Sequence, residues 1–514
     1  MLSLLSLSTL LAVVGLGLVA WDASQNQKQP VRVLIGLGLV VAAVTFRLWN
    51  GLGVWGTLTG LSLDIGLAFL VGGLILGSRK TQPSAFYALS VLGFGAALAF
   101  GSLGYFFDPA PIAEVEAAAE PTTERTYDSF LLELGPDDEI EEVLPLLDQH
   151  QARYERAFPE VTLIEDENLA RFFLIFVPRD LKEKLMDLLR DDLENVDTVE
   201  GNERVDWLTP ASVSAGSLPY ASETELSVND PRVSEQWGFD AMGGHAAIAL
   251  LEGLDPVRKA RVAIVDTGVD AAHEDVRDVF TRGSARTDEN GHGSHCAGIA
   301  GGVANNGIGI ASLNLDGRFI EVSGYAALGP DGFGTMEQIA QSVIDAAEDD
   351  ADVISMSLGA FGPFTPKVLV DAIAYAQRRG AIVVASAGNS NVDAYNHYPS
   401  NIAGVISVAA VDQRLNKARF SNTVASLTRP IAAPGVDILS LKNGGDYVQK
   451  SGTSMAAPMV AGLLGVMRAL QPELSAEDAY ALLVASGQEV RDSAQTGLVI
   501  RADQTLAAML QPAL

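Results

Sequence analysis

The apolar positions of this chain change character near residue 107. Before it, four apolar runs follow one another, and each is close to the 20 or so residues that span a bilayer as a helix. The runs lie at 2–21, 31–49, 58–77 and 84–107. The first alone would also suit a signal peptide, but it lacks a basic N-terminal region and a clear small-residue cleavage site. We therefore expect an all-α transmembrane domain of four helices at residues 1–107, which would anchor the chain in a lipid bilayer.

Basic residues predict the orientation of this domain. Lys28 and Arg32 flank the loop between the first two runs, and Arg79 and Lys80 lie between the third and fourth. Because loops rich in Lys and Arg stay on the cytoplasmic side, both ends of the domain are expected outside the cytoplasm. Asp64 lies within the third run, near its start. It is therefore either a functional carboxyl group or an interfacial residue.

The next 120 residues predict a small domain between two linkers. Residues 108–126 are rich in Ala, Glu and Pro, and residues 209–227 in Ser and Ala, so both are expected to be linkers. Between them, 127–208 show the order β-α-β-β-α-β, which predicts a ferredoxin-like α+β unit. The expected strands are 129–134, 161–164, 171–177 and either 196–199 or 205–208, and the expected helices are 138–150 and 180–191.

Residues 228–514 alternate short apolar runs with longer helical patterns. This alternation is typical of a mostly parallel sheet with helices on both faces, so we expect a large α/β domain. Its expected strands include 261–265, 319–322, 353–356 and 382–385, and its expected helices include 336–348 and 366–379. The run 455–470 is apolar throughout and reads as a buried helix.

Four polar residues stand at the ends of these expected elements. Ser454 directly precedes the buried helix, where unpaired N–H groups favour negative charge, although such a serine is often only an N-cap. Asp266 and Asn389 follow expected strands, at the edge where parallel sheets hold ligands, or else they belong to simple turns. His292 lies among glycines and small residues, where it is either exposed for chemistry or a plain loop histidine.

Together with their neighbours, these residues resemble the subtilisin-like serine peptidases. The Asp, His and Ser blocks stand in that family's order at 265–270, 292–298 and 451–460. The resemblance covers about residues 228–508. It implies a subtilisin-like fold and an endopeptidase that hydrolyses peptide bonds of polypeptide substrates through an acyl-enzyme.

The resemblance implies a role for each matching residue. Ser454 is the expected nucleophile, His292 the general base and Asp266 the carboxylate that orients it. Asn389 is the expected side-chain donor of the oxyanion hole. The residues expected to bind extended substrate are Gly332, Gly334, Ser357, Leu358, Gly359, Ser386 and Gly388.

Two more expectations rest on the resemblance. Ca²⁺ is common in the family, and Asp275 and Asn306 match ligand positions, although the loop around Asn306 is shortened. Residues 127–208 resemble the family's inhibitory propeptide, most closely over 171–208. We therefore expect a zymogen that cuts its own chain between about residues 202 and 226, after which the peptidase domain would be able to leave the membrane.

Charge and cysteine content limit the partners. The formal net charge is −30, and a surface of this kind does not attract nucleic acid. The single cysteine, Cys296, excludes an intrachain disulfide and is expected to be buried and to serve in packing. The rival hypothesis is a membrane sensor or scaffold protein whose peptidase domain is regulatory or inactive. The four filled catalytic positions argue against it.

Overall fold

The computed structural model describes residues 126–206 and 228–511, all within one compact unit, Glu124–Leu514. The four apolar runs, Asp64 and the linkers at 108–125 and 209–227 lie outside the described residues, so the expectations for them stay predictions. Within the described part, one helix, α13 (Thr453–Leu470), is long and apolar enough to cross a membrane. It lies buried in the core of the large domain, as expected for 455–470.

The small domain, here called the N-terminal module (residues 126–206), is a four-stranded antiparallel sheet in the order β2-β3-β1-β4. Two helices connect its strands in the manner of a split βαβ unit. The elements are β1 (Tyr127–Leu134), α5 (Ile140–Gln149), β2 (Arg153–Arg156), α6 (Glu167–Ala170), β3 (Phe172–Pro178), α7 (Lys182–Arg190) and β4 (Val196–Gly201).

One expected strand of the module was wrong, and the structure decides between the two alternatives for the last strand. Residues 161–164 form a turn, in which the Thr162 hydroxyl and N–H both donate to the Glu165 carboxylate, and Ile164 is 97% exposed. The second strand is β2, whose side chains are all exposed, so no apolar pattern marks it. The sheet is closed by β4, which confirms the alternative at 196–199, whereas β5 (Arg204–Asp206) pairs with β11 (Phe333–Thr335) of the large domain.

The module's sheet buries both faces because apolar residues stand at successive positions of β1. Phe130 and Leu132 point to α5 and α7. Leu131, on the opposite face, belongs to a core shared with α11 (Met336–Glu348) and α12 (Lys367–Arg378) of the large domain. Glu133 follows on that same face because side chains alternate along a strand. Its carboxylate lies 2.8 Å from Lys367 Nζ, at the start of α12.

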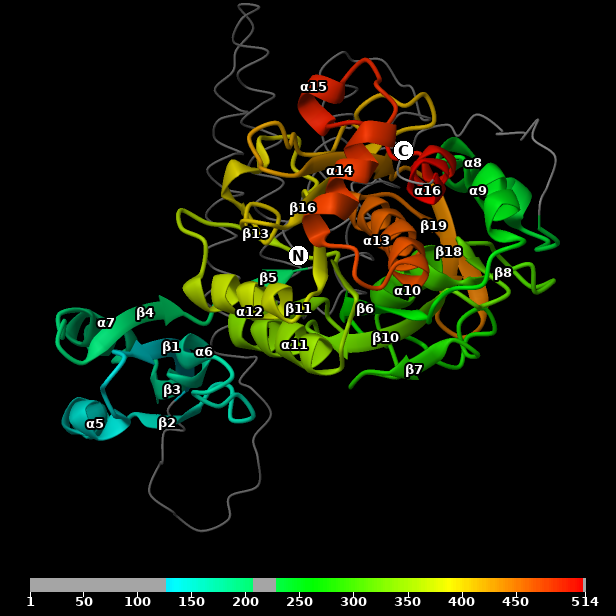
Figure 1. The fold of residues 1–514 in the computed structure, drawn as a ribbon. Helices are drawn as coiled ribbons and strands as arrows, with labels where there is room; N and C mark the ends of the chain where they lie inside the picture. The colour runs from blue at the N-terminus through cyan, green and yellow to red at the C-terminus, as the bar shows by residue number, and fades with distance from the viewer. Residues whose placement is uncertain (1–125, 207–227, 512–514) are drawn as a thin grey trace, which may run out of the picture. The chain divides into compact units, whose positions relative to one another are not determined.

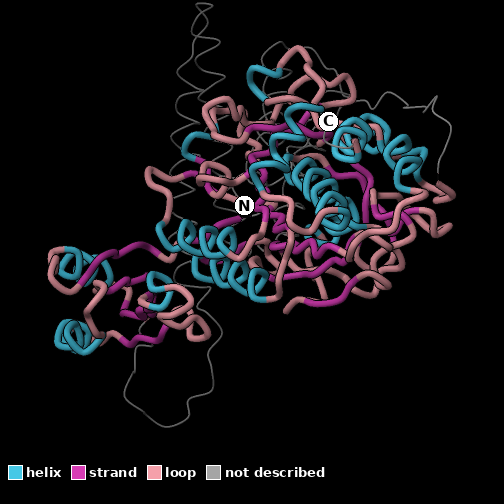
Figure 2. The backbone as a smooth tube through the Cα atoms, in the orientation of Figure 1, coloured by secondary structure: helices cyan, strands magenta, loops and turns pink. Residues whose placement is uncertain are grey.

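The large domain is built on a seven-stranded parallel sheet in the order β17-β16-β14-β12-β6-β10-β7 (Figures 1 and 2). Its strands are β6 (Ala260–Asp266), β7 (Phe280–Arg282), β10 (Ile320–Ala326), β12 (Val353–Met356), β14 (Ile382–Ser386), β16 (Ile406–Val411) and β17 (Pro430–Pro434). This sheet confirms the α/β fold expected for residues 228–514. The bounds of β12 and α11 are those expected from the sequence.

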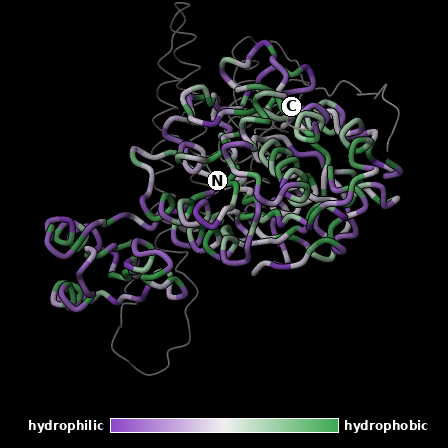
Figure 3. Tube along the Cα trace, in the orientation of Figure 1, coloured by the Kyte–Doolittle hydropathy of each residue, from purple (hydrophilic) through white to green (hydrophobic). Residues whose placement is uncertain are grey.

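Helices cover both faces of this sheet. In β6, Val262 and Ile264 contact the core that holds α13 and α10 (His292–Gly301), whereas Ala263 and Val265 contact the core under α11 and α12. Figure 3 shows hydrophobic residues concentrated along these inner elements, with hydrophilic residues frequent in the outer loops. A strand buried on both faces reads as a continuous apolar run, which is why the sequence pattern located β6.

Shorter elements complete the domain. Two-stranded pairs are formed by β8 (Val303–Ala304) with β9 (Asn314–Leu315), β13 (Ala360–Phe361) with β15 (His397–Tyr398), and β18 (Ile438–Lys442) with β19 (Asp446–Lys450). The remaining helices are η1 (Val233–Glu235), α8 (Trp237–Ala241), α9 (Gly244–Leu251), η2 (Ala394–Asn396), α14 (Ala476–Ser486), α15 (Ser493–Thr496) and α16 (Ala502–Leu510).

Candidate active site

Three elements bring the expected triad together. Asp266 is the last residue of β6, His292 the first of α10, and Ser454 lies in the first turn of α13. Because β6 is a central parallel strand, its carboxyl end faces the edge where helices begin and ligands bind. Residues that are 188 positions apart in the sequence, 266 and 454, therefore meet at one edge of the sheet.

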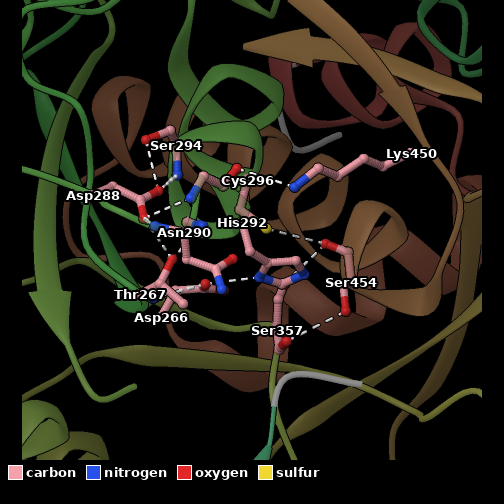
Figure 4. A network of polar contacts seen from close by, with 12 residues as sticks. Asp266, Thr267, Asp288, Asn290, His292, Ser294, Cys296, Ser357, Lys450 and Ser454 are labelled. Carbon is pink, nitrogen blue, oxygen red and sulfur yellow. Dashed lines mark hydrogen bonds and ion pairs between the residues drawn. The ribbon is translucent and has the colours of Figure 1, made fainter. Parts of the chain in front are cut away.

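The aspartate and histidine form a buried pair. His292 Nδ1 lies 2.7 Å from Asp266 Oδ1, and both side chains are fully buried. An ionised carboxylate only accepts hydrogen bonds, so Nδ1 carries the proton and Nε2 is left as the basic nitrogen. Figure 4 shows the imidazole between Asp266 and Ser454. Ser454 Oγ itself donates to the Ser357 carbonyl at 3.3 Å.

A second buried carboxylate, which sequence analysis missed, organises the loop before the histidine. Asp288 Oδ1 accepts hydrogen bonds from the Asn290 and Gly291 N–H groups at 3.0 and 2.7 Å and from Thr267 Oγ1 at 2.9 Å. Its Oδ2 accepts from the N–H and hydroxyl of Ser294, at 2.9 and 2.8 Å (Figure 4). Asp288 thus ties the segments that carry Asp266 and His292 to each other. The sequence offered one indication of this role, because Asp288 is an acidic residue shortly before the glycine-rich segment that carries His292.

Lys450 holds the same loop from the other side and was also missed. Its Nζ donates to the Gly291 carbonyl at 3.2 Å, so both polar groups of that residue are bound. Gly291 has φ +88°, a left-handed conformation that favours glycine. Burial lowers the pKa of Lys450. Since Lys450 ends β19, four residues before Ser454, it links the serine segment to the histidine loop.

The side-chain amide of Asn389, the expected oxyanion donor, lies against the start of α13. Its Oδ1 accepts from both the N–H and the hydroxyl of Thr453, each at 2.9 Å, which orients the amide group. Its Nδ2 lies 3.3 Å from the position that a Cβ would take on Gly452. The amide nitrogen is therefore directed towards the start of α13, beside Ser454. Amide groups are assigned by such networks, and this one leaves a single orientation.

The residues expected to bind extended substrate border a groove that already holds a strand. Gly334 of β11 pairs with Val205, and Gly359 pairs with Asp206 on the other side of β5. A Cβ on Gly334 would lie 1.9 Å from the Ala327 carbonyl, so no larger residue fits there. Ser357 and Leu358 are buried next to Gly359, and Gly332 turns the chain into β11 with φ +80°. The structure therefore brings this group together.

Two further predicted substrate residues lie at the end of β14. Ser386 is its last residue and is fully buried. The Gly388 N–H donates to Thr453 Oγ1 at 3.1 Å, and its φ of +98° requires glycine. Both therefore adjoin Asn389 and the start of α13, on the same side of the site as Ser454.

Cys296 and His295 are buried and uncharged. Burial raises the pKa of the Cys296 thiol well above its usual value, and its Sγ donates to the Ser454 carbonyl at 3.4 Å. The packing role expected for it is consistent with this position. Burial, aided by the charge of Lys450, lowers the pKa of His295 well below its usual value. Asp266, His292 and Cys296 offer ligand atoms within 4.8 Å of one another, so a thiophilic metal bound there would occupy the triad.

The two residues expected to bind Ca²⁺ also meet. Asn306 Nδ2 lies 3.3 Å from Asp275 Oδ1, and the Ile310 N–H donates to Asp275 Oδ2. Asp275 is fully buried, and burial raises its pKa. Nearby, Asp230 accepts from the N–H groups of Asn305 and Asn306, and its pKa is raised by burial to about 6. The nearby His273 partly offsets the effect of burial on the Asp275 pKa.

Comparison with known proteins agrees with this geometry. A profile of the Subtilase family matches residues 258–499. Thermitase from Thermoactinomyces vulgaris is 39% identical over 247 residues, which are 46% of this chain and 84% of the relative. The chain belongs to the subtilase family. It is thus a subtilisin-like serine peptidase, as the sequence motifs predicted.

Other subtilases resemble this one over the same kind of span. Subtilisin DY from Bacillus licheniformis is 37% identical over 243 residues, 45% of this subtilase and 85% of the relative. A solved protease structure from Pseudoalteromonas arctica PAMC 21717 aligns with a TM-score of 0.50 at 26% identity, over 55% of this chain and 99% of that one. These matches cover about half of the chain.

Proposed function

We propose that this subtilase is a membrane-anchored serine endopeptidase that acts outside the cytoplasm and is inhibited by its own N-terminal module. Its catalytic residues are Asp266, His292, Ser454 and Asn389. The observation that carries the proposal is the buried Asp266–His292 pair, 2.7 Å apart, beside a serine at the start of α13. A regulatory domain without catalysis has no need of this pair.

The chemistry follows from these positions. Ser454 Oγ attacks the peptide carbonyl carbon while His292 Nε2 takes its proton, and the proton then passes to the leaving amine as the C–N bond breaks. Water next attacks the acyl ester while His292 takes a proton from it. His292 then gives this proton to the Ser454 oxygen as the ester bond breaks. Asp266 stabilises the imidazolium, while Asn389 Nδ2 and the Ser454 N–H bind the oxyanion in a buried site where such bonds are strong.

Substitution of the triad tests this assignment. Ser454→Ala, His292→Ala and Asp266→Ala should each lower kcat by orders of magnitude, and double variants should lose little more, because the three residues act as a unit. The measurement is hydrolysis of an unfolded polypeptide by chains of equal thermal stability, with and without residues 1–107. Full activity in Ser454→Ala would exclude the serine mechanism and favour the sensor or scaffold alternative.

Self-processing is the second part of the proposal. Strand β5 lies between β11 and Gly359, as an extended substrate would. Asp206 pairs antiparallel with Gly359, and Ser357, two residues before Gly359, has a carbonyl that contacts Ser454. An extended substrate in this register would have the residue two positions after Asp206 opposite Ser357. We therefore expect the cut within 202–226, at the bond after Leu208.

The N-terminal sequence of the C-terminal fragment tests this, from wild type and from Ser454→Ala. It should begin at Thr209 in wild type and be absent in the variant. Self-processing is wrong if an active wild-type preparation stays full length, or if Ser454→Ala is cut at the same site without added protease. A cut elsewhere in 202–226 would contradict the predicted bond but would leave self-processing intact.

Membrane anchoring rests on residues 1–107 and on the distribution of their basic residues. A C-terminal alkaline phosphatase fusion to the full chain should be active, because both ends of the four-span domain are expected outside the cytoplasm. A fusion to a reporter that works only in the cytoplasm should be silent. The opposite pair of results would reverse the topology, and a chain that stays soluble would refute the anchor.

A structural Ca²⁺ is the last part of the proposal. Asp275 and Asn306 would supply oxygen ligands of the kind this ion prefers, and the Asp275 carboxylate is fully buried. The ion would stabilise the loop around Asn306 and take no part in catalysis. A chelator should shorten the half-life of wild type on heating and leave Asp275→Asn unaffected. Equal half-lives of wild type with and without chelator would exclude the site.

A further inference from the structure

Strand β5 shows which side chains the groove accepts. Arg204, Val205 and Asp206 pair with Thr335, Gly334 and Phe333 of β11. Val205 is almost fully buried, in the same core as Leu328, Met336 and Leu358. Arg204, one residue earlier, turns the opposite way because side chains alternate along a strand. The groove therefore presents an apolar pocket and, beside it, a separate contact surface for the preceding residue.

That second surface binds the guanidinium of Arg204 by two contacts. Arg204 Nη2 lies 2.8 Å from Asp331 Oδ2, and its Cζ lies 4.6 Å from the centre of the Phe333 ring. Asp331 supplies the opposite charge and Phe333 the aromatic face that a cation favours. Both partners belong to the large domain, whereas the arginine belongs to the strand that occupies the groove.

The acceptor is held in place independently of Arg204. Asp331 Oδ1 accepts the Phe333 N–H at 3.2 Å, which leaves Oδ2 directed at the guanidinium. The turn around it is closed by hydrogen bonds of 2.8 Å from Gly332 N–H to the Gly329 carbonyl and from Gly329 N–H to the Phe333 carbonyl. Asn290, two residues before His292, donates to the Pro330 carbonyl at 3.0 Å. The turn is thus preorganised and tied to the catalytic loop.

We propose that Asp331 and Phe333 form a subsite for a basic side chain in polypeptide substrates, at the residue that precedes the one buried opposite Gly334. The inference rests on the proposed proteolytic function. It adds a preference for arginine or lysine at one position. Both contact partners are largely exposed, at 65% for Arg204 and 62% for Asp331. An exposed ion pair and a cation–π contact together favour a basic residue by about 3- to 30-fold in kcat/KM.

The test uses peptides with the sequence of residues 200–214 that differ only at the position of Arg204, with Arg, Lys, Gln or Glu there. The enzyme is the full chain after activation. For wild type, kcat/KM should be about 3- to 30-fold higher with Arg than with Gln, and added salt should reduce this ratio. In Asp331→Asn the ratio should fall towards one, and Asp331→Lys should reverse the preference in favour of Glu. Phe333→Leu should lower the ratio in part.

A matched control separates the subsite from the general attraction of an acidic protein for basic peptides. Asp255→Asn also removes one exposed carboxylate, which contacts Arg318 and does not line the groove. This variant should keep the wild-type ratio of kcat/KM for the Arg and Gln peptides. Equal rates with Arg, Gln and Glu in wild type would refute the subsite while leaving the protease assignment intact. An equal fall of the ratio in Asp255→Asn and Asp331→Asn would also refute it. Failure of folded, activated enzyme to cut any of these peptides or an unfolded protein would refute the proposed function itself.

Discussion

Glu200 of the N-terminal module caps a helix of the peptidase domain, so substitution of Glu200 should weaken the binding of the module, which we propose to be an inhibitor. Its two carboxylate oxygens accept the Lys367 and Val368 N–H groups, each at 2.8 Å, at the start of α12. The helix has no side-chain cap of its own, since its N-cap residue is Pro366. The first N–H groups of a helix have no partners within it, so the module supplies what the helix lacks.

The size of the effect follows from these two bonds. A hydrogen bond to a charged group contributes about 1.5–3 kcal/mol at most, and water replaces part of it once the module has left. Burial raises the pKa of Glu200, which shows that desolvation offsets some of the gain. About 1–1.5 kcal/mol for each bond is a fair net value. Glu200→Ala should therefore weaken the hold of the module by about 2–3 kcal/mol, or roughly 30- to 150-fold. Glu200→Gln keeps one acceptor and should lose about half of that free energy.

The assay compares two times in the full chain: the appearance of the cut chain on a gel and the appearance of activity on a peptide. The lag between them reports release of the module. Glu200→Ala should shorten this lag by the factor above, and Glu183→Ala, an exposed glutamate on α7, should leave it unchanged. Hydrogen exchange in the uncut Ser454→Ala chain should show faster exchange at the Lys367 and Val368 amides in the Glu200 variant. An unchanged lag at an equal rate of cutting would refute the reasoning.

Three more predictions follow from buried groups of the large domain. Burial lowers the pKa of His397 to about 3, so its neutral ring contributes stability that is complete above pH 6.5 and is lost as the pH falls towards 3, by about 1.36 kcal/mol per pH unit. Between pH 4 and 6.5, the free energy of unfolding, measured with urea, should depend less steeply on pH in His397→Gln than in wild type, by the equivalent of one proton. The same slope in both proteins would contradict this. In Asp288→Asn, an amide NH₂ would face the N–H and hydroxyl donors of Ser294. Because this disturbs the loop that carries His292, kcat should fall about 10- to 100-fold with little change in KM. An unaltered kcat would exclude a positioning role. Gly334→Ala drives a methyl group into the Ala327 carbonyl and should raise KM for extended peptides more than for short esters; equal effects on both would count against the groove.

The sequence by itself determined the elements and residues that can be recognised from one short segment of the chain. Strand β12 and helix α11 were located with their observed bounds, because a doubly buried strand is a continuous apolar run and an amphipathic helix repeats every 3.6 residues. The expected catalytic residues were identified because the short segments around them resemble the Asp, His and Ser blocks of one family. The apolar run after Ser454 likewise required a buried helix, whatever its neighbours.

Only the tertiary structure decided what depends on contacts between distant segments. Strand β2 has no buried side chain, so only its pairing with β3 makes it a strand. Arg204–Asp206 would suit the edge of the module's own sheet, yet it lies in the groove because β11 and Gly359 offer it partners on both sides. Asp288 and Glu200 look like ordinary surface acids in the sequence. Glu200 becomes a helix cap because the fold brings it to the N–H groups of Lys367 and Val368, 167 and 168 positions away. Asp288 binds N–H groups that are close in the sequence, but it becomes an anchor because the fold also brings it to the hydroxyl of Thr267, 21 positions away.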